Sequence, residues 1–238
     1  METPLIALVP AAGTGSRAGA PDGVPKQYRA LRGEPMLRRA VRALLAEPRI
    51  AQVRVAVSAG DPWVARALDG LPRTVWRPCG GPTRAATVRA ALRDAALAPD
   101  AWVLVHDAAR PGLPADALAR LIDACLQEDL GGLLALPVAD TVKQADAGRR
   151  VGRTLPRDRL WLAQTPQMFR AGELRAALEA SARDERVTDE ASAVELSGGR
   201  PPLLVPGSRR NEKLTWPEDF EWFESWLRSQ DDGQEPHS

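Results

Sequence analysis

Short apolar runs alternate with segments of helical periodicity along most of this chain, and this alternation constrains the fold more than any other feature. Residues 5–9 form an uninterrupted apolar run, as expected for a strand buried on both faces of a parallel sheet. Residues 36–45 instead place their apolar side chains at helical spacing. Further strand-like runs lie at 53–57, 74–76, 102–105, 133–138 and 203–205. The alternation predicts an α/β fold with a doubly wound, mostly parallel, Rossmann-like sheet, whose ligands bind beyond the carboxyl ends of strands.

The later part of the chain adds helices and a hairpin to this pattern. Helices are predicted at 83–96, 171–182 and 189–196, and Pro217 opens a last helix rich in aromatic residues. Two short strands at 141–144 and 151–155 flank a turn and predict a hairpin that projects from the sheet. We expect a single domain over residues 1–228, a hairpin arm at about 139–157 and a disordered tail at 229–238.

Composition excludes several classes of protein. The net charge of +1 argues against a nucleic-acid binder. No apolar run approaches the roughly 18 residues of a membrane span, and the N-terminus does not resemble a signal peptide. Cys79 and Cys125 do not make a disulfide framework or a metal site. We therefore expect a cytoplasmic protein that binds neither membranes nor nucleic acid.

The loop after the first strand consists of small residues, and Arg17 and Lys26 follow in the chain. Small side chains let backbone amides approach a ligand closely, and such amides suit phosphate oxygens. The two cations can reach what the amides hold. The loop is therefore predicted to bind a nucleoside triphosphate through Pro10, Ala11, Ala12, Gly13, Thr14 and Gly15.

The same loop also satisfies a dinucleotide-binding fingerprint, since residues 13–18 match G-x-G-x-x-[G/A]. That fingerprint opens directly into a helix, whereas glycines and prolines continue here to Pro25. It also requires an acidic residue about 20 positions later at the end of the second strand, and Glu34 lies instead in a turn before a helix. A dehydrogenase is therefore a remote alternative, and a plain turn is the other interpretation.

Several motifs together resemble a known enzyme family. Pro10-x-Ala12-Gly13-x-Gly15-x-Arg17 with Pro25-Lys26-Gln27 resembles nucleotidyltransferases that activate sugars or alcohols. His106-Asp107-Ala108-Ala109-Arg110-Pro111 narrows the resemblance to the 2-C-methyl-D-erythritol 4-phosphate cytidylyltransferase family of isoprenoid biosynthesis. Further matches are Gly80-Gly81-x-x-Arg84, Asp140-Thr141-x-Lys143, Thr165-Pro166-Gln167, Thr188-Asp189-Glu190-Ala191-Ser192 and Asn211-x-Lys213-x-Thr215. The resemblance implies a fold of the nucleotide-diphospho-sugar transferase type and transfer of CMP from CTP to the acceptor.

The implied reaction assigns roles to the nucleotide side of the site. Its nucleophile, an acceptor phosphate oxygen, is already anionic, so catalysis needs alignment and charge neutralisation rather than a base. The resemblance assigns these tasks to Arg17 and Lys26. Mg²⁺ or another divalent cation is expected to bridge the phosphates, with Asp107 as the best carboxylate to orient the ion or its water. Nucleotide contacts are further implied for Gly81, Arg84, Thr87 and Lys213. A cation in the first turn of a helix is unfavourable, so Arg84 is expected to face a ligand or an ion-pair partner.

The acceptor side is implied by the same resemblance. Asp107, Arg110, Thr141, Arg157, Thr165 and Lys213 match positions that bind the polyol phosphate in this family. The family's hairpin reaches across a two-fold homodimer, so that Thr141 and Arg157 would serve the partner's site; a solvated ribbon is the alternative. The family usually has Asp-Asn-x-Lys where this chain has Arg210-Asn211-Glu212-Lys213, which removes one carboxylate. Rival functions are a cytidylyltransferase for another polyol phosphate, such as ribitol 5-phosphate, and a non-catalytic nucleotide-binding protein, against which the intact Arg17 and Lys26 argue.

Overall fold

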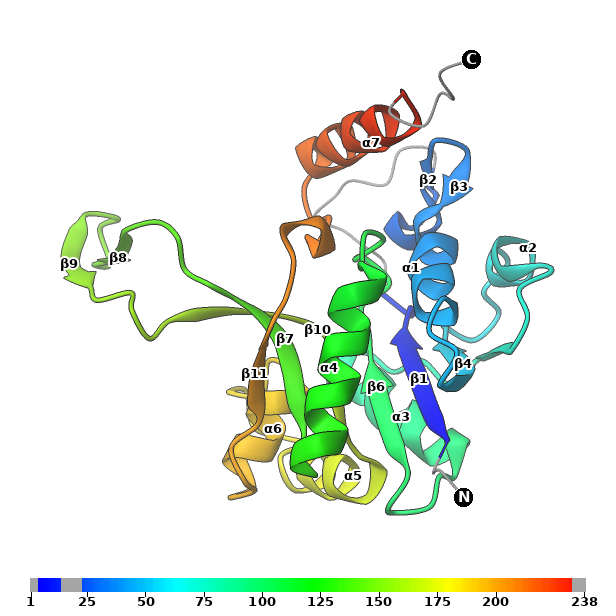
Figure 1. Cartoon of the computed structure of the whole chain (residues 1–238), viewed down its shortest axis with the longest axis horizontal. Coiled ribbons are helices and arrows are strands. Elements are labelled where there is room, and N and C mark those ends of the chain that lie inside the picture. Colours follow the sequence, from blue (N-terminus) through cyan, green and yellow to red (C-terminus); the bar gives the residue numbers. More distant parts are fainter. Residues whose placement is uncertain (1–3, 14–22, 233–238) are drawn as a thin grey trace.

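A mixed sheet forms the centre of the molecule (Figure 1). The computed structural model describes residues 4–13 and 23–232, and within them this sheet has 7 strands in the order β11-β7-β10-β6-β1-β4-β5. The strands are β1 (Leu5–Pro10), β4 (Ile50–Ala56), β5 (Thr74–Arg77), β6 (Trp102–Val105), β7 (Gly132–Pro137), β10 (Trp161–Arg170) and β11 (Leu203–Pro206). Neighbours are parallel except that β10 runs antiparallel to β6 and β7. The mostly parallel α/β sheet is confirmed.

Helices cover both faces of the sheet, because the side chains of its central strands alternate between two apolar clusters. In β1, Leu5, Ala7 and Val9 pack on one side, whereas Ile6 and Leu8 pack on the other, and all of them are buried. One apolar run thus contributes to two cores. The first face carries α1 (Met36–Leu45), α2 (Val64–Leu68) and α4 (Ala115–Glu128); the second carries α3 (Arg84–Ala95), α5 (Ala171–Ala180) and α6 (Glu190–Leu196).

The largest difference from the predicted elements concerns β10. The sequence predicts only a short return to the sheet at 160–163, but the strand continues to Arg170 and lies between β6 and β7. The sequence does not reveal this strand because it contains polar residues, which are buried here with their hydrogen bonds satisfied. Gln164 donates to the Ser208 carbonyl over 2.9 Å, and Gln167 donates to the Asp189 carboxylate over 2.8 Å. The buried amides therefore satisfy their polar atoms inside the protein, as burial requires.

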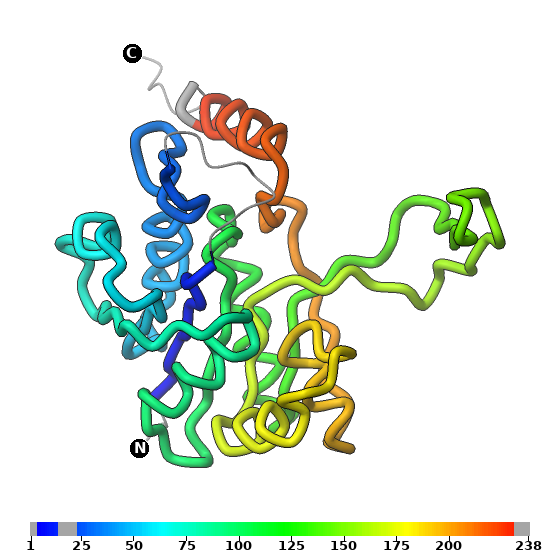
Figure 2. The backbone as a smooth tube through the Cα atoms, turned by 180° about the vertical axis from the view of Figure 1, so that it is seen from behind, coloured from blue at the N-terminus to red at the C-terminus, as the bar shows by residue number. Residues whose placement is uncertain are grey.

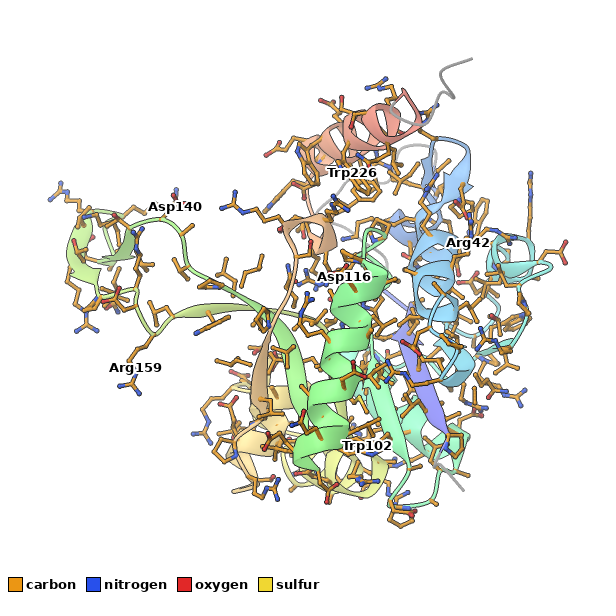
Figure 3. All side chains as sticks on the ribbon, viewed as in Figure 1. Arg42, Trp102, Asp116, Asp140, Arg159 and Trp226 are labelled. Atoms are coloured by element: carbon orange, nitrogen blue, oxygen red, sulfur yellow. The ribbon has the colours of Figure 1, made fainter. Side chains whose placement is uncertain are left out.

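Two further strands, β8 (Val142–Ala145) and β9 (Val151–Leu155), pair with each other antiparallel and not with the main sheet. Figures 1 and 2 show this hairpin standing well away from the body. Figure 3 labels Asp140 and Arg159 on the stretches that lead to it and from it. The second hairpin strand has the predicted bounds and the first lies one residue later than predicted. The role of the hairpin in a dimer stays a prediction.

The carboxyl end of β1 lies under a small separate layer. This layer contains the 3-10 helix η3 (Lys26–Tyr28), the two-stranded pair β2 (Ala30–Leu31) and β3 (Glu34–Pro35), the 3-10 helix η4 (Arg209–Asn211) and α7 (Pro217–Asp232). Phe220 and Phe223 of α7 pack with Leu31, Met36 and Leu214 in a third apolar cluster. Because α7 continues to Asp232, the prediction of a tail from residue 229 is wrong for its first residues; residues 233–238 lie outside the described part. None of the described helices combines the length and apolarity that crossing a membrane requires.

Candidate active site

A cavity of about 560 Å³ lies where the loops after β1 and β6 meet the start of α3. These loops follow carboxyl ends of strands, where ligands of doubly wound sheets bind. A larger cavity, about 800 Å³, lies near Tyr28, Arg38 and Trp63, and none of the predicted site residues that the structure describes lines it. The predicted site residues that line the smaller cavity are Pro10, Ala11, Ala12, Gly13, Lys26, Gly81, Arg84, Thr87, Asp107 and Lys213. Segments far apart in the chain therefore converge as the resemblance implies.

The remaining predicted residues lie elsewhere. Thr14, Gly15 and Arg17 fall outside the described residues. Arg110 and Thr165 are buried and hydrogen-bonded to the loop that follows β6, rather than lining the cavity. Two others, Thr141 and Arg157, are exposed at the base of the β8–β9 hairpin and do not line the cavity of the same chain.

The first loop and the Gly80-Gly81 loop pack tightly against each other. A Cβ added at Gly80 would lie 2.3 Å from the Cβ of Ala12, so only glycine permits this approach. The carbonyl of Ala11 accepts a hydrogen bond from the Gln27 amide over 2.9 Å, and that of Ala12 accepts one from the Ser58 hydroxyl over 3.1 Å. The backbone that is predicted to hold the nucleotide is thus fixed from several sides.

The hydroxyl of Thr87 closes the second loop. It accepts from the Gly81 N–H over 3.0 Å and lies 2.9 Å from the Thr83 carbonyl, to which it donates. Thr83 in turn caps α3, since its side chain accepts from the Ala86 N–H. Thr87 faces the Gly-Gly loop as expected from its position one turn after Thr83, and its buried hydroxyl shapes the loop that carries Gly81.

Four charged side chains form a cluster at the wall of the cavity. One oxygen of Asp107 accepts from Arg84 Nε over 2.7 Å, and the other accepts from Lys213 Nζ over 2.7 Å. Arg84 also donates from its two terminal nitrogens to the two oxygens of Glu190, over 2.7 and 2.9 Å. The ion-paired alternative for Arg84 is therefore observed, and its two carboxylates offset the unfavourable position in the first turn of α3.

The charges in this cluster set the protonation of its carboxyls. Burial alone raises the pKa of Asp107, but Arg84 and Lys213 outweigh it and hold that pKa well below its usual range. Asp107 is therefore ionised at neutral pH. Burial raises the pKa of Glu190, an effect that Arg84 opposes. Glu190 lies inside a motif that the resemblance matched, yet the sequence assigns it no role, because its partner stands more than a hundred residues earlier in the chain.

The two lysines reach the cavity from different segments that meet. Lys26, in η3, donates to the Leu214 carbonyl over 2.7 Å, and Lys213 precedes that residue. The contact joins the segment after the first loop to the segment before α7. The structure thereby places the ammonium groups of two predicted site residues at the same end of the molecule.

The described residues include no group of three or more His, Cys, Asp and Glu side chains arranged to hold a metal ion. Both oxygens of Asp107 already accept from cations. A carboxylate nevertheless has about four lone-pair sites, so Asp107 can also accept from a water. The residues present would fit a divalent ion held mainly by substrate phosphates, and Asp107 is the residue that would orient one of its waters.

The fold and the site together define a nucleotidyltransferase: a doubly wound sheet, a cradle of small residues, two lysines and an ionised aspartate at the strand ends. Comparison with known proteins gives the particular family. The model of the 2-C-methyl-D-erythritol 4-phosphate cytidylyltransferase family matches residues 5–229. The chain belongs to this family.

Individual relatives support the same family. The enzyme of this name from Bordetella pertussis is 70% identical over 231 residues, which cover 95% of this chain and 100% of the relative. A crystal structure of a 4-diphosphocytidyl-2C-methyl-D-erythritol synthase has a TM-score of 0.82 at 39% identity, covering 95% of this chain and 99% of that one. The crystal structure of the Francisella tularensis 2-C-methyl-D-erythritol 4-phosphate cytidylyltransferase has a TM-score of 0.79 at 33% identity, covering 94% of this chain and 99% of that one.

Proposed function

We propose that this chain transfers CMP from CTP to 2-C-methyl-D-erythritol 4-phosphate, giving 4-diphosphocytidyl-2-C-methyl-D-erythritol and pyrophosphate. The observation that carries the proposal is the placement of ionised Asp107 between Arg84 and Lys213 beside the small-residue loop, in a chain that matches the family over residues 5–229. The reaction is an in-line displacement. An acceptor phosphate oxygen forms a bond to the α-phosphorus of CTP while the bond from that phosphorus to the bridging oxygen of pyrophosphate breaks.

Charge neutralisation is the main catalytic task, because the nucleophile and the leaving group are both anionic. Lys26 lines the cavity next to the first loop and is assigned to the α-phosphate and the departing pyrophosphate. Arg17, which belongs to the same loop, is assigned to the same charges. No proton needs to leave the nucleophile, so the proposal includes no general base.

The nucleotide is assigned to the loops that pack on each other. Backbone groups of residues 10–15 and of Gly81 read the base and hold the phosphates. Thr87 supports them by holding the Gly81 N–H in place. Arg84 is assigned to the nucleotide side through its ion pair with Asp107. Lys213, the other cationic partner of Asp107, is assigned to both the nucleotide and the acceptor.

Mg²⁺, when bound, would neutralise phosphate charge and keep several of its waters. Asp107 is the residue of this chain that would orient such a water. Arg84 and Lys213 keep Asp107 ionised and fix both of its oxygens, so that the carboxylate would present one fixed position to a water. This assignment follows from the chemistry of the donor set.

The acceptor phosphate is assigned to Arg110 and Thr165 from the body of the protein. Arg110 Nε is buried and has no hydrogen-bond partner among the described residues, so a donor remains for a ligand. Thr141 and Arg157 are assigned to the acceptor site of a partner subunit in a cytoplasmic homodimer. The projecting hairpin supports this assignment, because it carries both exposed residues away from the cavity of their own chain.

Pyrophosphate release tests the proposal. We expect turnover with CTP and 2-C-methyl-D-erythritol 4-phosphate that requires a divalent cation and is much slower with ATP, GTP or UTP. Faster turnover with ribitol 5-phosphate would favour the rival polyol phosphate, and binding of CTP without turnover on any acceptor would favour a non-catalytic protein.

A further inference from the structure

Next to Asp107, four buried residues close a ring of hydrogen bonds. His106 Nε2 lies 3.1 Å from the Arg110 carbonyl, and Arg110 donates from Nη1 to the Asn211 carbonyl over 2.6 Å. The Asn211 amide donates to the Thr165 carbonyl over 2.7 Å, and the Thr165 hydroxyl lies 3.1 Å from His106 Nδ1. The ring joins the end of β6, the middle of β10 and η4.

The partners assign the tautomer of the imidazole. The Arg110 carbonyl can only accept, so His106 Nε2 must carry a hydrogen. The Thr165 hydroxyl already accepts from the Asp107 N–H over 3.0 Å, and it donates its hydrogen to an unprotonated Nδ1. If Nδ1 were also protonated, its hydrogen would go to the Thr165 oxygen, and the hydroxyl hydrogen would have no acceptor within the cycle. Neutral His106 with hydrogen on Nε2 is therefore the state that gives every hydrogen of the cycle an acceptor.

This direction matters for the assigned acceptor ligands. Thr165 is 4% exposed, and its hydroxyl donates its hydrogen to His106 Nδ1. The hydroxyl therefore serves the acceptor by holding His106 and the Asp107 N–H, and the assignment of Thr165 to the acceptor site is met in this indirect way. Arg110 is held at its backbone by His106 and at its guanidinium by Asn211, which leaves Nε unpartnered. The ring thus fixes Arg110 and, through the Thr165 hydroxyl, the backbone of Asp107, which lines the cavity.

We propose that His106 is a positioning residue for acceptor binding, acting through Thr165 and Arg110 by accepting at Nδ1 and donating at Nε2. The inference rests on the proposed function, because that function assigns Arg110 to the acceptor. A histidine that merely fills the core would contribute to stability and leave substrate affinities alone. The two roles therefore differ in what a substitution does to the acceptor KM of the folded enzyme.

Two substitutions of His106 each remove a different one of its two hydrogen bonds in the ring. His106→Asn keeps a polar group near the Nδ1 position and loses the donor to Arg110, whereas His106→Gln keeps a donor near Nε2 and loses the acceptor for Thr165. We expect each to raise the acceptor KM about tenfold or more, the range for an unsatisfied buried group, while the CTP KM changes less than about twofold. Thr165→Val breaks the same ring, so the His106→Gln, Thr165→Val double variant should cost little more than either single change.

Val41→Ala is the matched control, because Val41 is fully buried in α1 and does not line the cavity. It should lower the unfolding midpoint with both KM values unchanged. If the His106 variants behave like Val41→Ala, or if the double variant shows additive losses, the inference is wrong. If the wild-type enzyme fails to turn over any polyol phosphate, the proposed function fails instead.

The tautomer provides a readout that does not depend on activity. The chain has 2 histidines, of which the other is His237, so the ring nitrogens of ¹⁵N-histidine-labelled protein give few signals and His106→Gln assigns them. We expect a protonated Nε2 and an unprotonated Nδ1 for His106 at pH 7. A protonated Nδ1, alone or together with Nε2, would overturn the direction of the ring.

Discussion

Glu190→Gln is expected to destabilise the protein more than any exposed ion-pair change. Glu190 is 0% exposed and accepts two hydrogen bonds from Arg84. Removing one partner of a buried ion pair costs about 3–5 kcal/mol, because the other charge stays buried. Gln retains one acceptor for Arg84, and Arg84 keeps Asp107 as a counter-charge with its own side chain 27% exposed. The expected loss therefore lies at the low end, about 3 kcal/mol. For a chain of this size that loss corresponds to a melting temperature lower by about 6–12 °C.

The assay compares thermal and urea unfolding of three proteins. The control is Glu179→Gln, because Glu179 pairs with Arg93 over 3.1 Å but both side chains are largely exposed. Exposed pairs contribute less than about 1 kcal/mol, so this variant should melt within a few degrees of the wild type. The two variants remove the same charge and the same kind of hydrogen bond, so burial is the difference between them.

Two results would refute the reasoning. One is a Glu190→Gln melting temperature within about 2 °C of the wild type, and the other is an equal shift in the two variants. The first would mean that the cavity wall relaxes to solvate Arg84. The second would mean that both pairs contribute by contact alone and that burial adds nothing.

Three further outcomes are expected. Lys26→Ala should lower kcat by about a hundredfold or more with little change in the dissociation constant for CTP, and near-normal turnover would remove its assigned role. Burial lowers the pKa of His106 to about 4, and Asp107 and Arg110 are its charged neighbours. As the pH falls from about 6.5 to 4, His106 therefore takes up a proton in the unfolded chain but not in the folded one. The wild type should therefore lose about 3 kcal/mol of stability relative to His106→Gln over that window in urea denaturation, and parallel pH curves would contradict this. Mixed dimers of inactive Lys26→Ala and inactive Arg157→Ala subunits should regain activity if the hairpin serves the partner, and verified mixed dimers without activity would argue against sharing.

Periodicity predicted most of the fold because apolar positions carry the information. The run at 5–9 alternates between two cores, and the segment predicted as a helix at 83–96 is α3, with Thr83 as its cap. Strand β10 escaped the same logic, since Gln164 and Gln167 look like a loop until their partners on other segments are known. A polar residue can be placed in a core only when its hydrogen bonds are known, and those bonds are long-range.

The candidate site shows the same division. That the loops after β1 and β6 converge follows from the rule for strand ends, and these loops do line one cavity with Lys26 and Lys213. The sequence could say that Arg84 needs a ligand or a counter-charge, but not that Glu190 supplies it. The role of His106 could not be predicted from the sequence, because its neighbours in the ring become visible only once β10 and η4 are in place.

Asp107 is where the charged cluster and the hydrogen-bonded ring meet. Its carboxylate is fixed by Arg84 and Lys213, and its N–H is fixed by the Thr165 hydroxyl. The turn that contains it is closed by the Arg110 N–H, which donates to the Asp107 carbonyl over 3.1 Å. A shift of the backbone at this residue would therefore move both networks together. Because His106, Asp107 and Arg110 lie in one short turn, the proposed function predicts that a change at this turn alters acceptor and nucleotide binding together.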